Sequence, residues 1–463
     1  MRKVYNNVLE AVGDTPIVRL NSVTKGIQGK LYAKLEMLNP AGSIKDRLAL
    51  QIVADAEADG TLKPGGKIVE GTSGNTGAGL AMVAAVKGYT CTFVMPDKQS
   101  EEKRAALRAY GSKVVITPTA VEPEDERSYY SVSKKLAGEP GAFYANQYHN
   151  PSNPRTHLLS TGPEIWDQMG EELDAIICGL GTGGTISGIG EYFKKTNPKV
   201  QIIGVDPVGS VYFDYFHTGQ MTQPYTYVVE GIGEDFMPST VQWEFIDDVV
   251  RVNDVESFQM TRRIVQEEGI FCGGSGGSVV AGALKWIERN DKPDLKVLVI
   301  LPDSGSRYMS KIFNDSWMRE QGFLDAKSSM GRVRDLVKHM GTRKLVSVGP
   351  DATAAEVIGL MKMKGVSQVP VLDDGQIVGI LSETALLEHS LKSGGENSKV
   401  QDLIQMDYCT IEDAESVEVL TDLFRRYKVA FVVSSKGNSH KVHDIITKID
   451  LIDYIAARNG GRK

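Results

Sequence analysis

Short runs of β-branched and other apolar residues alternate with helical patterns between about residue 67 and residue 303. The runs are almost continuously apolar, which is typical of strands covered on both faces. They predict strands at 67–70, 90–95, 113–117, 175–178, 201–205 and 296–301. Helical patterns separate them, as at 76–87, 100–110 and 185–195. The alternation predicts a parallel, doubly wound α/β sheet, in which ligands bind at the carboxyl ends of the strands.

The pattern changes after Phe323, where a short polar segment begins. Beyond it lie two weakly similar units, each with a helix, a β run, a turn, a second β run and a closing helix. Paired internal repeats bury each other's exposed faces, so these units are expected to form a separate domain. We therefore predict an α/β domain, a linker and two repeated motifs, at 1–324, 325–341, 342–396 and 397–463.

Composition narrows the class of protein. The 463 residues are 41% apolar and 24% charged, with a net charge of −7, and this length suggests about two to four domains. The acidic balance disfavours a nucleic-acid binder, which would need clustered Lys and Arg. No stretch approaches the roughly 20 apolar residues of a membrane span. The first residues lack an apolar signal segment, so we expect a cytoplasmic protein that binds no membrane.

Cysteine and histidine spacing gives no sign of a metal centre. The four cysteines form no CxxC pair, and the seven histidines lack ligand spacing such as HExxH. Buried free thiols are the expectation for cysteines spaced in this way. We predict no metal site and no heme.

The first glycine-rich loop, 72–77, follows a predicted strand and begins a predicted helix. Small residues let the backbone approach an anion, and free N–H groups at a helix start point toward it. The hydroxyls of Thr72, Ser73 and Thr76 add donors that suit a carboxylate. The same pattern is also typical of a tight strand-to-helix turn with Ser/Thr caps.

The second loop, 179–185, has the composition of a phosphate cradle. It also matches G-x-G-x-x-G, with Asp206 where a ribose-binding acid would lie, so a nicotinamide-dependent oxidoreductase is a competing interpretation. Against it, Thr182 and Thr185 suit a terminal phosphate, and hydride chemistry would leave Lys45 without a role. A lysine amine can hold an aldehyde cofactor as a Schiff base. Lys45 and the two loops together indicate pyridoxal phosphate (PLP).

A third segment, 272–278, precedes an apolar helical run at 279–286. A capped helix start would explain it, but Ser275 could also meet a ring nitrogen. A neutral hydroxyl would not stabilise a protonated pyridine as a carboxylate does. It would therefore limit carbanion delocalisation and favour prompt loss of a β-leaving group.

In their order along the chain, these motifs resemble the cysteine synthase and cystathionine β-synthase group of PLP enzymes. The motifs that carry the resemblance are 40–47, 72–77, 181–185 and 273–275. Further segments favour the second of the two families, at 146–148, 203–207, 229–233 and 301–304. The C-terminal repeats resemble tandem CBS motifs. The resemblance covers about residues 4–460 and implies a fold type II catalytic core, like the tryptophan synthase β-subunit, followed by a Bateman module.

The resemblance implies a role for each matching residue. Lys45 would bind the cofactor covalently and later move protons. Asn75 would meet the ring hydroxyl and Ser275 the pyridine nitrogen. The phosphate would be held by Gly181, Thr182, Gly183, Gly184 and Thr185. The amino-acid carboxylate would be held by Thr72, Ser73, Thr76 and Gln147, and the second substrate would lie near Gly231, Gly233 and Glu234.

The reaction implied is β-replacement, which joins L-serine and L-homocysteine into L-cystathionine and water through an aminoacrylate. Cysteine synthase chemistry, with O-acetylserine and sulfide, is the near alternative. Glu234 keeps it open, because several relatives have tyrosine there. An alternative of another class is a catalytically silent sensor of an adenosyl ligand. The resemblance also implies a homodimer or homotetramer.

The second C-terminal repeat carries a T-x-x-D pattern at Thr447 and Asp450, by which such repeats hold an adenosine ligand. The first repeat has Ser382 and Ala385 at the matching positions. We expect at most one competent site, and the resemblance suggests S-adenosylmethionine as its ligand. A purely structural or oligomerising module is the alternative. The chain lacks the N-terminal extension that carries heme ligands in animal enzymes, so it resembles the heme-free branch.

Overall fold

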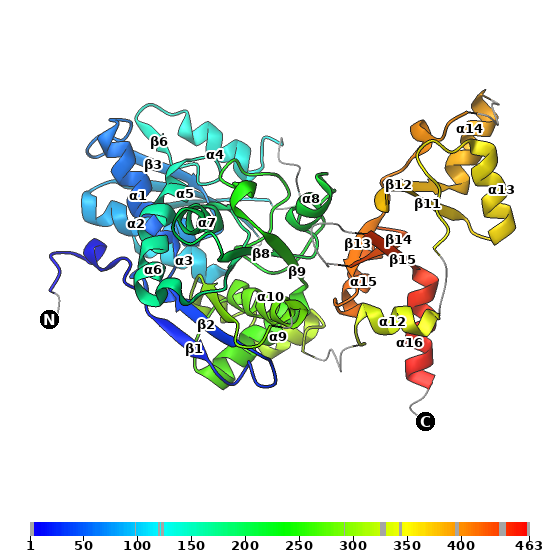
Figure 1. Cartoon of the computed structure of the whole chain (residues 1–463). Helices are drawn as coiled ribbons and strands as arrows, with labels where there is room; N and C mark the ends of the chain where they lie inside the picture. The colour runs from blue at the N-terminus through cyan, green and yellow to red at the C-terminus, as the bar shows by residue number, and fades with distance from the viewer. Residues whose placement is uncertain are drawn as a thin grey trace. The chain divides into compact units, whose positions relative to one another are not determined.

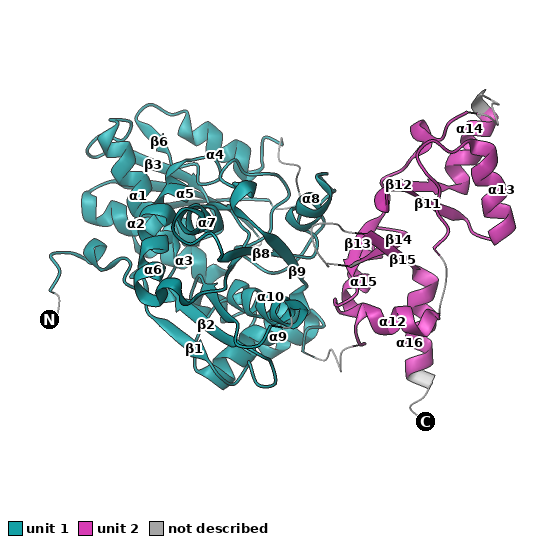
Figure 2. Cartoon of the chain, viewed as in Figure 1, with its two compact units in different colours: residues 1–326 teal, residues 327–463 magenta. Residues whose placement is uncertain are grey.

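The computed structural model describes residues 4–97, 99–118, 121, 125–290, 292–324, 330–341, 345–393, 398–434 and 441–460. The chain forms two compact units, residues 1–326 and residues 327–463 (Figure 2). None of the helices within the described ranges is long and apolar enough to cross a membrane.

The N-terminal unit contains two sheets (Figure 1). The larger has the order β1-β2-β10-β7-β8-β9, with bounds Ile17–Leu20, Lys30–Leu35, Lys296–Leu301, Ala175–Gly179, Gln201–Pro207 and Asp248–Val252. Its strands are parallel except for β1, which pairs antiparallel with β2 at one edge. The smaller sheet is parallel throughout and has the order β5-β4-β3-β6, with bounds Lys113–Thr117, Thr90–Pro96, Lys67–Gly71 and Ala142–Tyr144.

The doubly wound α/β class and all six expected strands are confirmed, but the expectation of one sheet was wrong. The smaller sheet has a core of its own, which includes Ile68, Phe93 and Leu107. The two faces of the larger sheet belong to separate buried clusters, one around Val299 and the other around Leu298. A continuous apolar run shows that a strand is covered on both faces, but not which sheet it joins. Strands β1, β2, β6 and β9 were not predicted.

Helices cover both sheets of this unit. They are α1–α11, with bounds Lys45–Ala58, Asn75–Lys87, Glu101–Ala109, Tyr129–Ala137, Ser152–Thr156, Gly162–Met169, Gly184–Thr196, Tyr212–Thr218, Asp254–Arg263, Gly274–Asn290 and Asp315–Glu320. Short 3-10 turns are η1, η2, η4, η5 and η7, at Val8–Ala11, Glu36–Leu38, Gly170–Glu172, Trp243–Phe245 and Gly305–Tyr308. Two π-helical turns, η3 and η6, occupy His157–Thr161 and Ile264–Glu268.

The third glycine-rich segment differs from its prediction. Helix α10 begins at Gly274, so these glycines form its first turns and do not precede a helix that starts at 279. The reason is close packing on α9. A Cβ at Gly277 would collide with the Ser257 carbonyl and the Thr261 side chain. Glycine is tolerated within the helix because no larger residue would fit.

The two halves of the C-terminal unit repeat the same order of elements. The first contains α13, β11, β12 and α14, at Ala354–Lys364, Gln368–Asp373, Gln376–Ser382 and Glu383–Ser393. The second contains β13, α15, β14, β15 and α16, at Cys409–Glu412, Val417–Leu423, Val429–Ser434, Lys441–Thr447 and Lys448–Gly460, with the 3-10 turn η8 (Gln401–Leu403) before it. Each half holds an antiparallel hairpin. Each hairpin also has a parallel partner that precedes the first helix of its half. Val348 pairs with Val371 of β11 in the first half, and β13 pairs with β14 in the second.

The segment expected to be a linker, 325–341, contains helix α12 (Val333–Met340). Val333 and Leu336 are buried, and α12 packs against α16 within the same unit. Apolar residues three apart lie on one helix face, which explains why this part of the segment folds. Residues 330–341 therefore belong to the C-terminal unit.

Candidate active site

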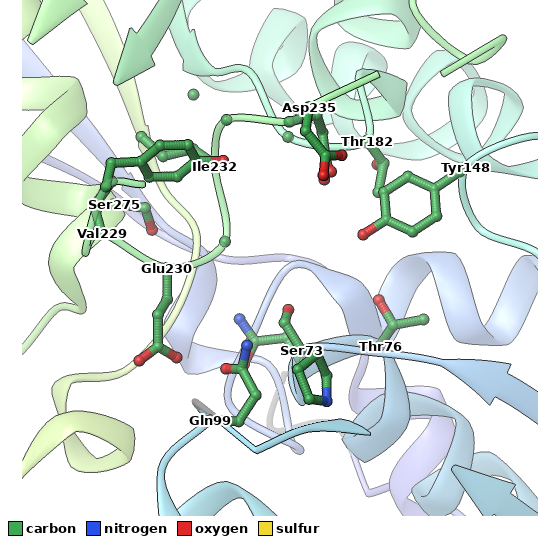
Figure 3. A pocket seen from close by; sticks show the side chains of 18 of the residues that line it. Ser73, Thr76, Gln99, Tyr148, Thr182, Val229, Glu230, Ile232, Asp235 and Ser275 are labelled. Carbon is green, nitrogen blue, oxygen red and sulfur yellow. The ribbon is translucent and has the colours of Figure 1, made fainter. Parts of the chain in front are cut away.

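Loops from both sheets of the N-terminal unit border one cavity of about 560 Å³. Figure 3 shows Ser73, Thr76 and Gln99 on one side of it, and Thr182 and Ser275 on the other. The cavity is lined by most of the predicted site residues, namely Lys45, Ser73, Asn75, Thr76, Gln147, Gly181, Thr182, Gly183, Thr185, Gly231, Gly233, Glu234 and Ser275. Thr72 and Gly184 are not part of the lining, and Thr447 and Asp450 belong to the other unit.

Lys45 begins helix α1 at the edge of the cavity. The Ile44 N–H donates to the Pro302 carbonyl at 2.8 Å, which ties this helix start to the end of β10. The Lys45 side chain is half-buried because it borders the cavity. Burial lowers its pKa to about 8, although the charges of Glu234 and Asp303 favour the protonated form. The amine is therefore partly neutral near pH 7, as a nucleophile requires.

Asn75 opens helix α2 beside a buried carboxylate. Its Nδ2 donates to Asp303 Oδ2 at 2.7 Å, and the Tyr308 hydroxyl donates to the same oxygen at 2.6 Å. These bonds fix the orientation of the Asn75 amide. Its Oδ1 is buried and has no partner among the described residues. An acceptor is thus left for a ligand in the cavity.

The second loop places bare backbone against the cavity. Gly183 has φ +83, and a Cβ there would collide with Val241. A Cβ at Gly181 would lie 2.7 Å from the Gly231 carbonyl oxygen, and one at Gly184 would collide with the Asn153 side chain. Only glycine fits these positions, and Gly184 is the first residue of helix α7. The loop has the form of an anion cradle at a helix N-terminus.

The first loop divides its hydroxyls between two tasks. Thr72 Oγ1 accepts from the N–H groups of Gly74 and Gly77 at 3.0 and 3.2 Å, so it closes the turn and does not face the cavity. Thr76 Oγ1 donates to Gln147 Oε1 at 2.6 Å on the cavity wall. Ser73 also lines the cavity. Thr72 therefore matches the interpretation as a capped turn. Ser73 and Thr76 border the cavity, as the interpretation as a ligand-binding loop requires.

Sequence reasoning missed a charged cluster on the wall. Glu230 lies between Lys103, at 2.5 Å, and Lys311, at 2.6 Å. Burial opposes ionisation, but the two lysines hold the pKa of Glu230 below its usual range. The segment 229–233, which contains Glu230, is one of the motifs named from the sequence. No motif spacing marks the two lysines that pair with it.

Three tyrosines on the wall were also missed. The hydroxyls of Tyr129 and Tyr148 are 3.3 Å apart, and the Tyr130 and Tyr148 rings have centroids separated by 6.4 Å. Burial raises the pKa of all three, and the nearby Glu234 carboxylate raises it further. The tyrosines are therefore neutral near pH 7. Tyr129 and Tyr130 are adjacent in the sequence, which gives no periodic signal.

The predicted regulatory pair forms a helix cap. Asp450 Oδ2 accepts from the Thr447 N–H at 2.8 Å and from its hydroxyl at 2.6 Å, at the start of α16. In the first repeat, Ser382 Oγ accepts from the Ala385 N–H at the start of α14. The two pairs thus occupy equivalent positions, and only the second repeat has a carboxylate there.

Comparisons with known proteins agree with this geometry. The model of the pyridoxal-phosphate dependent enzymes matches residues 8–303, and the CBS domain model matches residues 333–392. The chain is therefore a pyridoxal-phosphate dependent enzyme with a C-terminal CBS domain. Within that class it belongs to the cystathionine β-synthase family. The cystathionine beta-synthase of Oryctolagus cuniculus is 37% identical over 475 residues, which cover 98% of this chain and 86% of that protein.

Two further relatives match about two thirds of the chain. The cysteine synthase of Staphylococcus aureus (strain Mu50) is 39% identical over 310 residues, which cover 67% of this chain and 97% of that protein. The crystal structure of O-ureido-L-serine synthase is 38% identical with a TM-score of 0.62, and covers 68% of this chain and 100% of that one. About a third of this chain therefore has no counterpart in these two relatives.

The cavity fits pyridoxal phosphate on three observations. Lys45 supplies a partly neutral amine, which a covalent link to an aldehyde needs. The loop around Gly183 leaves no room for side chains and suits a phosphate. The unpartnered Oδ1 of Asn75 can accept from a ring hydroxyl. The nicotinamide interpretation is not needed, because Asp206, its expected ribose-binding acid, does not line the cavity. Asp206 Oδ2 instead accepts from the Phe213 N–H at 2.8 Å.

Proposed function

We propose that the chain joins L-serine and L-homocysteine into L-cystathionine and water by PLP-dependent β-replacement. When bound, PLP supplies an electron sink for negative charge at the substrate Cα. In this proposal Lys45 holds the cofactor covalently, the glycine loop around Gly183 holds its phosphate, and Asn75 and Ser275 meet its ring. The observation that carries the proposal is a lysine amine with a pKa of about 8 in the same cavity as an anion cradle.

The chain's own residues then orient the substrate and move protons. Ser73, Thr76 and Gln147 hold the serine carboxylate on one wall of the cavity. Lys45 Nζ takes the proton from Cα and gives a proton to the departing hydroxyl, which leaves as water. A pKa near neutrality suits a group that must both accept and donate. Ser275, as a neutral hydroxyl, offers no charge to stabilise a protonated ring nitrogen.

The second substrate enters beside Gly231 and Gly233 in this proposal. The match to cystathionine β-synthases along nearly the whole chain supports homocysteine. Cysteine synthase chemistry is the second candidate, favoured by the similarity of the N-terminal unit to a cysteine synthase. Glu234 is the residue on which this choice depends, since its carboxylate repels a hydrosulfide anion more than a zwitterionic amino acid.

One experiment separates the two candidates. The values of kcat/KM for serine with homocysteine and for O-acetylserine with sulfide are measured on the same preparation. We expect the first pair to dominate; a dominant rate with O-acetylserine and sulfide would overturn the substrate assignment. A catalytically silent sensor would show neither reaction and no visible absorbance from bound PLP.

We further propose that the C-terminal unit binds S-adenosylmethionine at Thr447 and Asp450, and that the chain forms a homodimer or homotetramer without heme. The four buried free thiols support a reducing compartment, and we propose the cytoplasm. Titration calorimetry of the full chain with S-adenosylmethionine tests the regulatory site. If the titration showed no binding heat, and other adenosyl compounds showed no competition, the proposed S-adenosylmethionine site would be refuted.

A further inference from the structure

Behind the glycine loop 179–185, one segment of chain contacts both of the loop's threonines. It runs from Asn153 in α5 into the π-helix η3, and it packs against α7. Gly188 permits this close approach, because a Cβ there would lie 2.8 Å from the His157 Cβ. Asn153 and His157 are both 0% exposed, so they reach the cavity only through Thr182 and Thr185.

The first contact fixes the hydroxyl of Thr182. Asn153 Nδ2 donates to the Gln147 carbonyl at 2.7 Å and to Thr182 Oγ1 at 2.9 Å. A carbonyl can only accept, so it determines which end of the amide faces Thr182. Thr182 Oγ1 is therefore an acceptor toward Asn153. Its own hydrogen is left for the cavity, which Thr182 lines.

The second contact passes through an imidazole. His157 Nε2 is 3.2 Å from Thr185 Oγ1, and Nδ1 is 2.8 Å from Thr161 Oγ1. Burial lowers the pKa of His157 well below its usual value, and the charges of Lys45 and Arg47 add to this effect. A neutral imidazole has one N–H and one acceptor nitrogen. The two hydrogen bonds must therefore run in the same direction, either toward Thr185 or away from it.

Thr161 decides the direction. It is 0% exposed, and within the described part of the chain its hydroxyl has His157 as its one hydrogen-bond partner. If Nδ1 carried the proton, the Thr161 hydrogen would be buried without an acceptor, which is unfavourable. Thr161 therefore donates to Nδ1, and Nε2–H donates to Thr185. The hydrogen left over belongs to Thr185, which borders the cavity.

We propose that Asn153, His157 and Thr161 are positioning residues that turn the hydroxyl hydrogens of Thr182 and Thr185 toward the cofactor phosphate. An ionised phosphate oxygen only accepts hydrogen bonds. Two hydroxyls that already accept from behind present it with donors alone. The inference rests on the proposed assignment of this loop to the phosphate of PLP.

A matched set of variants of the full chain tests it. Thr161→Val removes the hydroxyl that orients His157, and Thr161→Ser keeps it. Thr156→Val is the control from the same segment, because Thr156 Oγ1 is buried and has no partner in the described structure. The apoenzymes are titrated with PLP, and the bound phosphate is observed by ³¹P NMR. We expect roughly tenfold weaker PLP binding and a moved ³¹P resonance for Thr161→Val alone. Equal behaviour of Thr161→Val and Thr156→Val would overturn the proposal.

A spectroscopic measurement tests the same direction in the parent chain, with one variant used only to assign the resonances. Histidine labelled with ¹⁵N reports the tautomer of each of the seven histidines, and His157→Gln identifies the resonances of His157. We expect the Nε2–H tautomer in the PLP-bound enzyme. The Nδ1–H tautomer would contradict the proposed direction of the hydrogen bonds from Thr161 through His157 to Thr185. Neither readout depends on the thiol substrate. Failure of the serine and homocysteine reaction would remove the proposed function and leave this test intact.

Discussion

The catalytic cavity and the T-x-x-D pair of the C-terminal unit are both sites that motifs predicted, yet their polar groups are in opposite states. In the cavity, Asn75 Oδ1 is buried without a partner, and the amine of Lys45 has a lowered pKa. In the C-terminal unit, Asp450 Oδ2 already accepts two hydrogen bonds from Thr447. The cavity is prepared for a ligand, whereas the T-x-x-D pair already stabilises a helix start.

This contrast shows what a motif alone leaves undecided. The same side chains can close a turn or wait for a ligand, and Thr72 and Thr76 show both outcomes within one loop. An unsatisfied buried atom costs free energy, and at Asn75, which borders the cavity, a bound ligand can compensate for that cost. Substitutions should therefore have different effects at the two sites: lost chemistry at the cavity and lost stability at the cap.

The largest effect is expected at Lys45. Lys45→Ala removes both the covalent anchor and the proton-transfer group, so turnover should fall by roughly 10³-fold or more. The visible absorbance of bound PLP should be lost, which absorption spectra of the purified protein measure directly. Lys63→Ala, on an exposed loop of the same unit, is the control and should behave like the parent protein. If Lys45→Ala kept both the absorbance of bound PLP and its turnover, the assignment of Lys45 to the cofactor would be wrong. The contrast between the two sites would then lose its main support.

Two glycines should respond to alanine with opposite signs. At Gly184 the added Cβ would collide with the Asn153 side chain, so Gly184→Ala should lower the stability of the N-terminal unit by about 1–3 kcal/mol and weaken PLP binding. At Gly359, inside α13, the added Cβ meets no described atom within 4 Å. Gly359→Ala should therefore stabilise the C-terminal unit by up to about 1 kcal/mol. Thermal unfolding, with and without PLP, measures both changes; two changes of the same sign would contradict the cradle geometry.

The sequence predicted the residues that carry the chemistry of the cavity better than the residues that position them. Lys45, Asn75 and Ser275 lie in motifs whose spacing is visible along the chain. His157 and Lys311 are brought to the site by contacts between distant segments, and no local period marks them. The split into two sheets was missed for the same reason, since burial on both faces reads identically in either sheet.

The pH dependence of cofactor attachment should report the environment of Lys45. Attack on the aldehyde needs the neutral amine, so the rate of PLP attachment to the apoenzyme should rise with pH and level off above about pH 8. Glu234 favours the protonated amine. Glu234→Gln removes that charge and should move the midpoint to lower pH, whereas Glu267→Gln, exposed on η6 of the same unit, should leave it unchanged. Stopped-flow absorbance measures both midpoints; an upward shift in Glu234→Gln would contradict the assigned electrostatics.

The smallest effect is expected at the T-x-x-D pair. Asp450→Ala removes the acceptor of the Thr447 N–H at the start of α16, and loss of such a cap costs about 1 kcal/mol. Local opening should then become roughly fivefold more frequent, which hydrogen–deuterium exchange of peptides spanning 441–458 detects. Asp453→Ala is the control from the same helix, because Asp453 is exposed and the carboxylate that accepts from Thr447 is that of Asp450. If Asp450→Ala left exchange unchanged but abolished S-adenosylmethionine binding, the pair would serve the ligand and not the helix, and the contrast with the cavity would disappear.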